Sequence, residues 1–364
     1  MSARSAATRV AGATAATAGL VVAGAAAGFL TERRLYRRPS EQPFIGPDLG
    51  SLRGTPTTVR AEDGVELFVD VDDPAGDDPS GLTVVFVHGY ALDLHSWHFQ
   101  RQALRGRHRL VFYDHRSHGR SSRSNKERCT LEQLGADLRT VLDAVVPSGP
   151  VVLVGHSMGG MTIMALAEQS PELFGTRIVG TGLVSTSAGD LDAVTVGLPG
   201  LPGKMMHRLA PGVLAALARA PKTVESGRRV GSDLGYVLTQ RYAFGAEVPT
   251  RFVEFTDEML SATPIDVVAA FFPVFAMHDR YAALEAIRRV PAAVVCGTRD
   301  LFTPVSHSRE LGRRLPSADV HKLDGAGHMV ILERAHEVSR ALGDLIETAR
   351  LDGARQDTDS GVER

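Results

Sequence analysis

The chain has 364 residues, 43% of them hydrophobic, so it can form one large domain with an insertion, or two domains. Its 40 basic and 42 acidic residues give a formal net charge of -2, which provides no basic surface for nucleic acid. The two cysteines, Cys129 and Cys296, do not indicate a disulfide framework.

The N-terminus differs in kind from the rest of the chain. Residues 10–30 carry no charge and are long enough to cross a hydrocarbon core of about 30 Å, although alanine and glycine, which gain little in lipid, dominate the stretch. More arginines follow it than precede it, so we predict a membrane anchor within residues 1–38 that leaves the body of the chain in the cytoplasm. The alternatives are a cleaved signal peptide, which would export the chain, and a disordered leader. The arginines are Arg4, Arg9, Arg33, Arg34, Arg37 and Arg38.

Strand-like runs begin after residues 39–56, an aperiodic segment whose prolines and glycines indicate a linker. Turn residues separate the first two runs, as in a β-hairpin, and an amphipathic helix is predicted at 131–146. Strands that alternate with helices predict an α/β fold with a mainly parallel, doubly wound sheet, formed by 57–185 and 280–350. The strand-like runs are 57–61, 65–71, 82–87, 108–114, 151–155, 178–185 and 291–297.

Residues 186–279 contain no strand-like run, and their apolar spacing predicts a helical lid inserted into the sheet domain. One helix is expected to start with Thr263 as N-cap and Pro264 at the first helical position, and to be kinked at Pro273. The polar tail 351–364 is predicted to be disordered. Apolar side chains of the lid are candidates for the wall of a ligand pocket: Met205, Met206, Phe271, Phe272 and Phe275.

The run VVLVGHSMGG places Ser157 between a buried strand and a helix. Gly155, Gly159 and Gly160 permit a tight bend there. A serine in a G-x-S-x-G sequence on such a bend projects above the sheet, beside the first N–H groups of the helix. This geometry is typical of a nucleophile, which also needs a base to take its proton and a carboxylate to orient that base.

Two downstream residues can complete this constellation. Asp300 lies just past the last strand-like run, and His328 lies in a glycine-rich loop before the last helix. The order serine, aspartate, histidine is that of the nucleophile-elbow hydrolases. On these residues the chain resembles the α/β-hydrolase fold family, in its lid-bearing esterase and lipase branch, over about residues 57–348. Asp190 and Asp279 stay open as alternative carboxylates.

Two more segments carry the resemblance. VFVHGYALDLHSW resembles the oxyanion loop of the family, which implies that the backbone N–H groups of Tyr90 and Met158 bind the oxyanion. YDHRSHGRSS resembles the D-x-R-G-x-G-x-S segment of the family. Ser117 replaces the first glycine of that segment, so we expect the loop around His118 to differ in shape.

The remaining histidines are assigned supporting roles. His88 is predicted to organise the oxyanion loop and to border the substrate pocket, and His156 is predicted to be structural. Two i, i+3 histidine pairs lack an H-E-x-x-H motif or carboxylate-rich partners, so neither a metal nor a cofactor is expected. These pairs are His95/His98 and His115/His118.

The resemblance implies a serine hydrolase that cleaves carboxylic esters of small molecules with an apolar acyl portion, through an acyl-enzyme. An epoxide hydrolase or haloalkane dehalogenase of this fold would be expected to use an aspartate nucleophile, and Ser157 argues against both. Four activities that can use the same triad stay open: C–C bond hydrolase, thioesterase, lactonase and cofactor-free peroxidase. The alternative outside catalysis is a ligand-binding, receptor-like protein.

Overall fold

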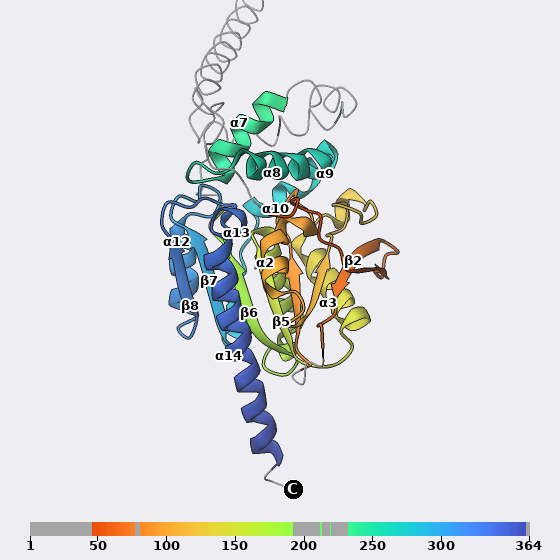
Figure 1. The fold of residues 1–364 in the computed structure, drawn as a ribbon. Helices are drawn as coiled ribbons and strands as arrows, with labels where there is room; N and C mark the ends of the chain where they lie inside the picture. Colours follow the sequence, from red (N-terminus) through yellow and green to blue (C-terminus); the bar gives the residue numbers. More distant parts are fainter. Residues whose placement is uncertain (1–45, 77–80, 192–211, 213–218, 220–231, 362–364) are drawn as a thin grey trace, which may run out of the picture.

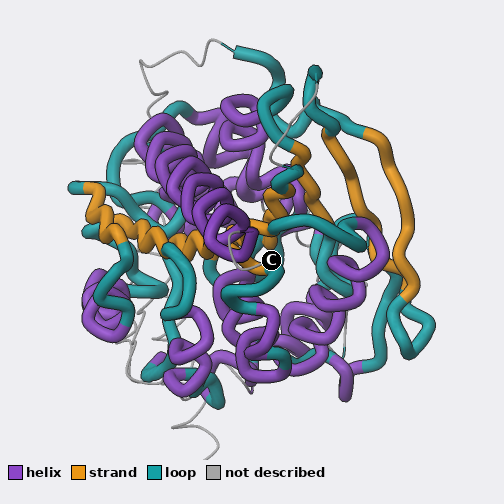
Figure 2. The backbone as a smooth tube through the Cα atoms, turned by 90° about the horizontal axis from the view of Figure 1, so that it is seen from below, coloured by secondary structure: helices purple, strands orange, loops and turns teal. Residues whose placement is uncertain are grey.

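The computed structural model describes residues 46–76, 81–191, 212, 219 and 232–361 (Figure 1). The leader 1–38 and two predicted pocket residues, Met205 and Met206, lie outside this part of the chain. A central sheet divides the described chain into two layers of helices, with further helices above one edge of the sheet (Figures 1 and 2).

The sheet has eight strands in the order β1-β2-β4-β3-β5-β6-β7-β8. β2 pairs with β1 and with β4 in the antiparallel sense, and the other neighbours are parallel, so the predicted hairpin and the mainly parallel sheet are confirmed. β8 was not predicted, because an edge strand with charged residues lacks a clear apolar run. The strands are β1 (Thr55–Arg60), β2 (Glu66–Asp72), β3 (Thr83–Val87), β4 (Arg109–Tyr113), β5 (Val151–His156), β6 (Ile178–Val184), β7 (Ala292–Gly297) and β8 (Asp319–Leu323).

Helices cover both faces of the sheet, which confirms the doubly wound fold (Figure 2). One layer contains α2 (His98–Leu104), α13 (Val330–Glu333) and α14 (Ala335–Gly361). The other contains α3 (Leu131–Val145), α4 (Met158–Gln169), α11 (Leu284–Ile287) and α12 (Val305–Arg314). The predicted helix at 131–146 is α3.

The central strand β5 shows why its sequence is apolar without alternation. Val151 and Leu153 belong to the hydrophobic cluster on one face, whereas Val152 and Val154 belong to the cluster on the other face. All four side chains are fully buried. A parallel strand covered on both sides needs apolar residues at every position, and its carboxyl end then opens toward the same edge as those of its neighbours.

The segment between β6 and β7 contributes four described helices above the carboxyl edge of the sheet (Figure 1). We call residues 232–276 the helical insertion. The kink expected at Pro273 is a break, because α10 starts at that residue. Thr263 is not an N-cap as predicted; it is the C-cap residue that follows α8, and Pro264 takes the N-cap position of α9. The helices are α7 (Ser232–Ala243), α8 (Thr250–Ala262), α9 (Ile265–Phe271) and α10 (Pro273–Ala276).

The C-terminal segment differs from the expectation of disorder. α14 continues through residues 351–361 and projects beyond the lower end of the sheet (Figure 1). A helix that is already formed extends at little cost, since each further residue adds a hydrogen bond without a new nucleation step. The polar composition of residues 351–361 therefore does not end the helix at Leu351.

Among the described residues, no single helix is long and apolar enough to cross a membrane. α8 and the stretch Ile265–Ala276 meet the criteria of length and composition only together, as a pair bent by 85°. The predicted anchor at 10–30 lies outside the described residues.

A buried arginine ties the loop after β4 to two other elements. The Arg116 side chain is fully buried, and its Nε donates to Asp137 Oδ2 of α3 at 2.6 Å. Its Nη1 donates to Asp63 Oδ2, in the turn between β1 and β2, at 2.8 Å. Asp137 is fully buried as well, so its negative charge is stable there only because Arg116 supplies the counter-charge.

Replacement of Arg116 by leucine should lower the free energy of unfolding by about 3 kcal/mol or more, because it leaves the Asp137 carboxylate buried without a counter-charge. Urea unfolding of both proteins measures the difference. The matched control is Arg139→Leu, which breaks a solvent-exposed pair with Asp143 and should cost about 1 kcal/mol or less. If both variants lost the same free energy of unfolding, the stabilising role of the buried Arg116–Asp137 pair would be contradicted.

Candidate active site

Ser157 lies at the bend where β5 ends and α4 begins. Its backbone has φ +53° and ψ -118°, a conformation that L-residues rarely adopt. The Ser157 N–H donates to the Val184 carbonyl of the neighbouring strand β6 at 2.9 Å, which holds the bend against the sheet. Strain of this kind, sustained by surrounding structure, is typical of a nucleophile elbow.

The glycines of the motif are needed for close approach. A Cβ at Gly159 would overlap the Val87 carbonyl oxygen at the end of β3. A Cβ at Gly160 would lie 2.6 Å from the Thr186 side chain, and one at Gly155 would meet the start of α4. The backbone of α4 can therefore begin directly against β3 and β6 only because these positions lack side chains.

The structure brings Ser157, His328 and Asp300 together from three separate loops. His328 Nε2 lies 3.0 Å from Ser157 Oγ. His328 Nδ1 lies 3.0 Å and 2.9 Å from the two carboxylate oxygens of Asp300. With the Nδ1 proton directed to the carboxylate, Nε2 faces the serine hydroxyl as a proton acceptor.

The surroundings of Asp300 favour its ionised form. Burial by itself would raise the pKa of this carboxyl, but the neighbouring His328 and hydrogen bonds from His328 and Thr303 outweigh it and hold the pKa below its ordinary value. The N–H groups of Phe302 and Thr303 both donate to Oδ1 at 2.9 Å. Asp190, the alternative carboxylate, instead accepts a hydrogen bond from the Tyr281 hydroxyl.

The two predicted oxyanion donors border the same bend. Met158 is the first residue of α4, so its N–H has no acceptor within the helix and lies at the positive end of the helix dipole. Tyr90 follows Gly89 in the turn after β3. Within the described part of the chain, neither N–H donates to a backbone carbonyl. The Tyr90 hydroxyl donates to the Val268 carbonyl of α9.

His88 has no exposed surface and does not border an open pocket, contrary to the prediction. Its Nδ1 lies 2.7 Å from the Gly89 carbonyl, and its Nε2 accepts the His115 N–H at 2.9 Å. Both ring nitrogens are thus engaged with the backbone of adjacent loops. The burial of His88 depends on how the loops pack around it, and the sequence His88-Gly89 alone does not reveal that packing.

Ser117 takes a backbone conformation that favours glycine, with φ +65°. Its N–H donates to the Ser122 carbonyl at 3.0 Å, and its Oγ accepts the Ser124 N–H at 2.9 Å. The serine side chain therefore adds a hydrogen bond inside the loop that a glycine could not make. His118 in this loop is buried against Phe271, with the ring centres 5.3 Å apart.

The described pocket candidates occupy different positions. Phe271 is fully buried in an apolar cluster that also contains Met158. Phe275 is half-buried, and its ring packs edge-on against Tyr90 with centroids 5.0 Å apart. Phe272 is half-buried on the surface of the insertion.

Phe302 is a site residue that the sequence reasoning missed. Its ring lies edge-on to the His328 imidazole, with centroids 5.1 Å apart, and the residue is 41% exposed. The exposed aromatic ring therefore forms an apolar wall directly beside the histidine. The available signal was the apolar pair Leu301 and Phe302 directly after Asp300 in a loop, where polar residues are usual.

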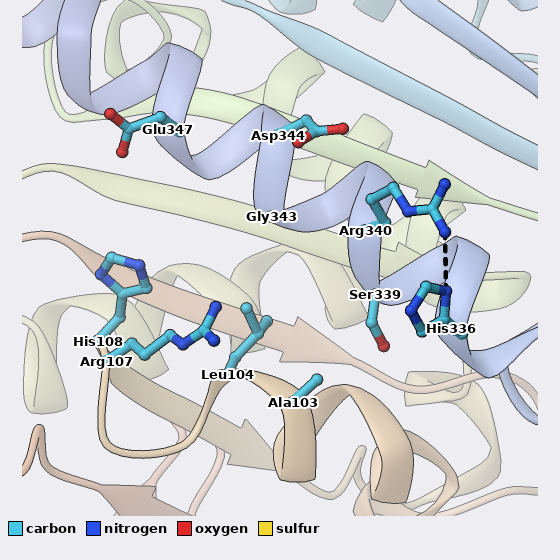
Figure 3. A pocket seen from close by; sticks show the side chains of 10 residues that line it. All are labelled: Ala103, Leu104, Arg107, His108, His336, Ser339, Arg340, Gly343, Asp344 and Glu347. Atoms are coloured by element: carbon cyan, nitrogen blue, oxygen red, sulfur yellow. Dashed lines mark hydrogen bonds between the residues drawn. The ribbon is translucent and has the colours of Figure 1, made fainter.

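A surface groove of about 740 Å³ between α2 and α14 contains none of these residues (Figure 3). Charged and polar side chains line it, including Arg340, whose guanidinium donates to His336 Nδ1 at 2.9 Å. Among the described residues, no three His, Cys, Asp or Glu side chains gather in a way that could hold a metal ion.

His156, next to the nucleophile, contacts the loop of the histidine. Its Nε2 lies 3.0 Å from the His328 carbonyl, so a proton on Nε2 joins the two loops by a hydrogen bond. Burial lowers the pKa of His156 to about 3. Its ring, 4.9 Å from that of His328, therefore stays neutral near pH 7 and does not repel positive charge on His328.

Buried histidines make the stability depend on pH. Burial lowers the pKa of His115 to about 3, whereas the unfolded chain keeps the ordinary value near 6.5. Below that value the unfolded state binds a proton that the folded state excludes, so stability falls as the pH falls from about 6.5 to about 3. His115→Gln should reduce this slope by up to about 1.4 kcal/mol per pH unit, measured by urea unfolding. If the variant kept the same dependence of the free energy of unfolding on pH, the lowered pKa of His115 would be contradicted.

Comparison with known proteins places these features in a family. The family model described as "Alpha/beta hydrolase family" matches residues 84–341. Over 271 residues the chain is 28% identical to a monoacylglycerol lipase of Mycolicibacterium smegmatis, a match that covers 71% of this chain and 83% of the relative. It is 26% identical to the dihydrolipoyllysine-residue acetyltransferase component of an acetoin cleaving system of Pseudomonas putida, over 72% of this chain but only 62% of that protein.

A solved structure agrees with this placement. The enol-lactonase from Burkholderia xenovorans LB400 is similar with a TM-score of 0.62 and 25% identity, over 80% of this chain and 100% of the lactonase chain. The sheet order, the strand-to-helix bend at Ser157 and the family match over more than half of the sequence agree with one another. The chain therefore belongs to the alpha/beta hydrolase family.

Proposed function

We propose that this alpha/beta hydrolase cleaves carboxylic esters with an apolar acyl portion, through an acyl-enzyme on Ser157. The observation that carries the proposal is the contact series from Ser157 Oγ through His328 to the Asp300 carboxylate, at 3.0 Å and 2.9 Å. The monoacylglycerol lipase and the enol-lactonase support it, since both a monoacylglycerol and a lactone contain a carboxylic ester bond.

The proposed reaction follows from the geometry. His328 Nε2 takes the hydroxyl proton as Ser157 Oγ attacks the carbonyl carbon of the ester, and the negative charge moves to the carbonyl oxygen. The N–H groups of Tyr90 and Met158 donate to this oxyanion. When the intermediate collapses, His328 gives the proton to the departing alkoxide. Water, deprotonated by His328, then releases the acid from Ser157.

Apolar side chains around the site support an apolar acyl portion. Phe302 forms a wall beside His328, and Phe275 of the helical insertion packs on Tyr90. Burying methylene groups against such walls contributes about 0.8 kcal/mol per CH₂. In this proposal the helical insertion acts as a lid over the acyl chain. The room beneath the insertion then limits the length of the acyl chain that can bind.

Hydrolysis of p-nitrophenyl esters of increasing acyl length by the full-length protein tests the proposal. We expect multiple turnovers, a preferred chain length and complete loss of turnover in Ser157→Ala. The matched control is Ser185→Ala, which removes a buried serine hydroxyl at the end of β6 and should retain activity. Absence of turnover on every ester, or equal rates in Ser157→Ala, would overturn the proposal. Turnover confined to thioesters or C–C bonds would also overturn it.

Asp300→Asn distinguishes Asp300 from Asp190 as the carboxylate that orients His328. The amide cannot hold His328 in the tautomer that the reaction needs, so kcat should fall by about 10⁴-fold with little change in KM. Asp190→Asn, the matched control, should stay within a few-fold of the wild type, because Asp190 bonds to Tyr281. Steady-state kinetics of both variants checks this. A large loss in Asp190→Asn with a small one in Asp300→Asn would reverse the assignment.

A further inference from the structure

The turn that carries the Tyr90 N–H is strained. Ala91, the next residue, has φ +55°, in the left-handed region that residues with a side chain avoid. Within the turn, the Leu92 N–H reaches the Gly89 carbonyl at 3.3 Å, which is long for a backbone hydrogen bond. A strained turn persists only where neighbouring structure holds it, so the source of that support decides where the Tyr90 N–H points.

The helical insertion supplies two hydrogen bonds to this turn. The Thr263 hydroxyl donates to the Ala91 carbonyl at 3.1 Å. The Tyr90 hydroxyl donates to the Val268 carbonyl in α9, and burial raises the pKa of Tyr90, so this donor keeps its proton. The two bonds join residues that are 172 and 178 positions apart in the sequence. Thr263 lies at the junction of α8 and α9, and Val268 lies within α9.

Apolar packing reinforces the same junction. Tyr90 packs against the apolar cluster formed by Phe271, Val274 and Met158. Both predicted oxyanion residues therefore lie in or beside a cluster that includes side chains of α9 and α10. Thr263 is only 3% exposed, so water cannot readily replace its hydroxyl at the Ala91 carbonyl.

We propose that Thr263 and the Tyr90 hydroxyl are positioning residues, through which the helical insertion holds the oxyanion turn in its strained conformation. The inference rests on the proposed ester hydrolysis and goes beyond it, because the insertion then contributes to transition-state stabilisation as well as covering the acyl chain. An oxyanion donor is effective only within about 2.7 to 3.1 Å of the developing charge, so small displacements of Tyr90 reduce the rate.

Thr263→Val and Tyr90→Phe each remove one hydroxyl and keep the shape of the side chain. We expect about a tenfold loss of kcat on the preferred p-nitrophenyl ester with KM within about twofold, because the ground state makes no use of the oxyanion donors. The affinity for a trifluoromethyl ketone, which forms a tetrahedral oxyanion with the serine, should fall by the same factor as kcat/KM.

Matched controls lie in the same part of the molecule. Thr256→Val removes a hydroxyl that donates within α8, to the Phe252 carbonyl at 2.8 Å. Tyr281→Phe removes the hydroxyl that bonds Asp190. Both should leave kcat within twofold of the wild type. The inference would be overturned if the controls lost as much kcat as Thr263→Val and Tyr90→Phe. The loss would then follow from removing any hydroxyl in this region and not from the contacts to the oxyanion turn.

A rescue experiment separates positioning from general damage. Glycine adopts a positive φ without strain, so Ala91→Gly should make the turn less dependent on Thr263. We expect the double variant Ala91→Gly, Thr263→Val to recover most of the kcat that Thr263→Val alone loses. Unchanged kcat in both Thr263→Val and Tyr90→Phe, or a loss confined to KM, would overturn the inference.

Labelling of Ser157 by a fluorophosphonate distinguishes failure of this inference from failure of the proposed function. If the wild type neither hydrolyses esters nor reacts with the probe, the proposed function and the inference both fall. If the wild type is active and both hydroxyl variants match it, the inference alone falls. Should Thr263→Val not fold, Tyr90→Phe, which removes one oxygen atom, decides the question by the same kinetic criteria.

Discussion

The tight bend between β5 and α4 is the constraint on which the rest of the site depends. It holds Ser157 at φ +53°, at a cost of about 1 to 3 kcal/mol for a strained residue, and lets α4 begin directly against the end of β3. Gly159 makes that contact possible, since any side chain there would overlap Val87. The packed sheet therefore presents the serine hydroxyl to His328 without reorganisation, which is the condition for an effective preorganised site.

Burial also shapes the charge around this bend. His88, His115, His118 and His156 are fully buried, and the pKa of each is lowered, chiefly by burial. Of these four, His156 has its neutral ring 4.9 Å from the His328 ring, and the lowered pKa of Asp300 keeps a negative charge beside His328. An imidazolium formed in the proposed reaction would lie beside its counter-ion, the Asp300 carboxylate, and the neutral His156 ring would not oppose its charge.

The helical insertion and the sheet domain pack together through two apolar clusters. One joins α8 to the sheet domain, and the other joins Met158 of α4 and Leu134 of α3 to Phe271 of α9. Contacts of this kind make the insertion a support for the bend and the oxyanion turn. In the proposed function, changes in the insertion would therefore alter both the fit of the acyl chain and the rate of bond cleavage.

The sequence by itself determined the features that local pattern encodes. Apolar runs specified seven strands, and the glycines around Ser157 specified the bend, because both depend on residues that are neighbours in the chain. Motif order likewise singled out Asp300 and His328, which the fold then brings to one edge of the sheet.

Only the tertiary structure decided the exposure and long-range contacts of single side chains. It buried His88, exposed Phe302 beside His328, extended α14 and directed the Thr263 hydroxyl to the Ala91 carbonyl instead of a helix N-terminus. These features depend on how separate segments pack, in the case of Thr263 and Ala91 segments 172 residues apart, and this information is absent from any local stretch of sequence.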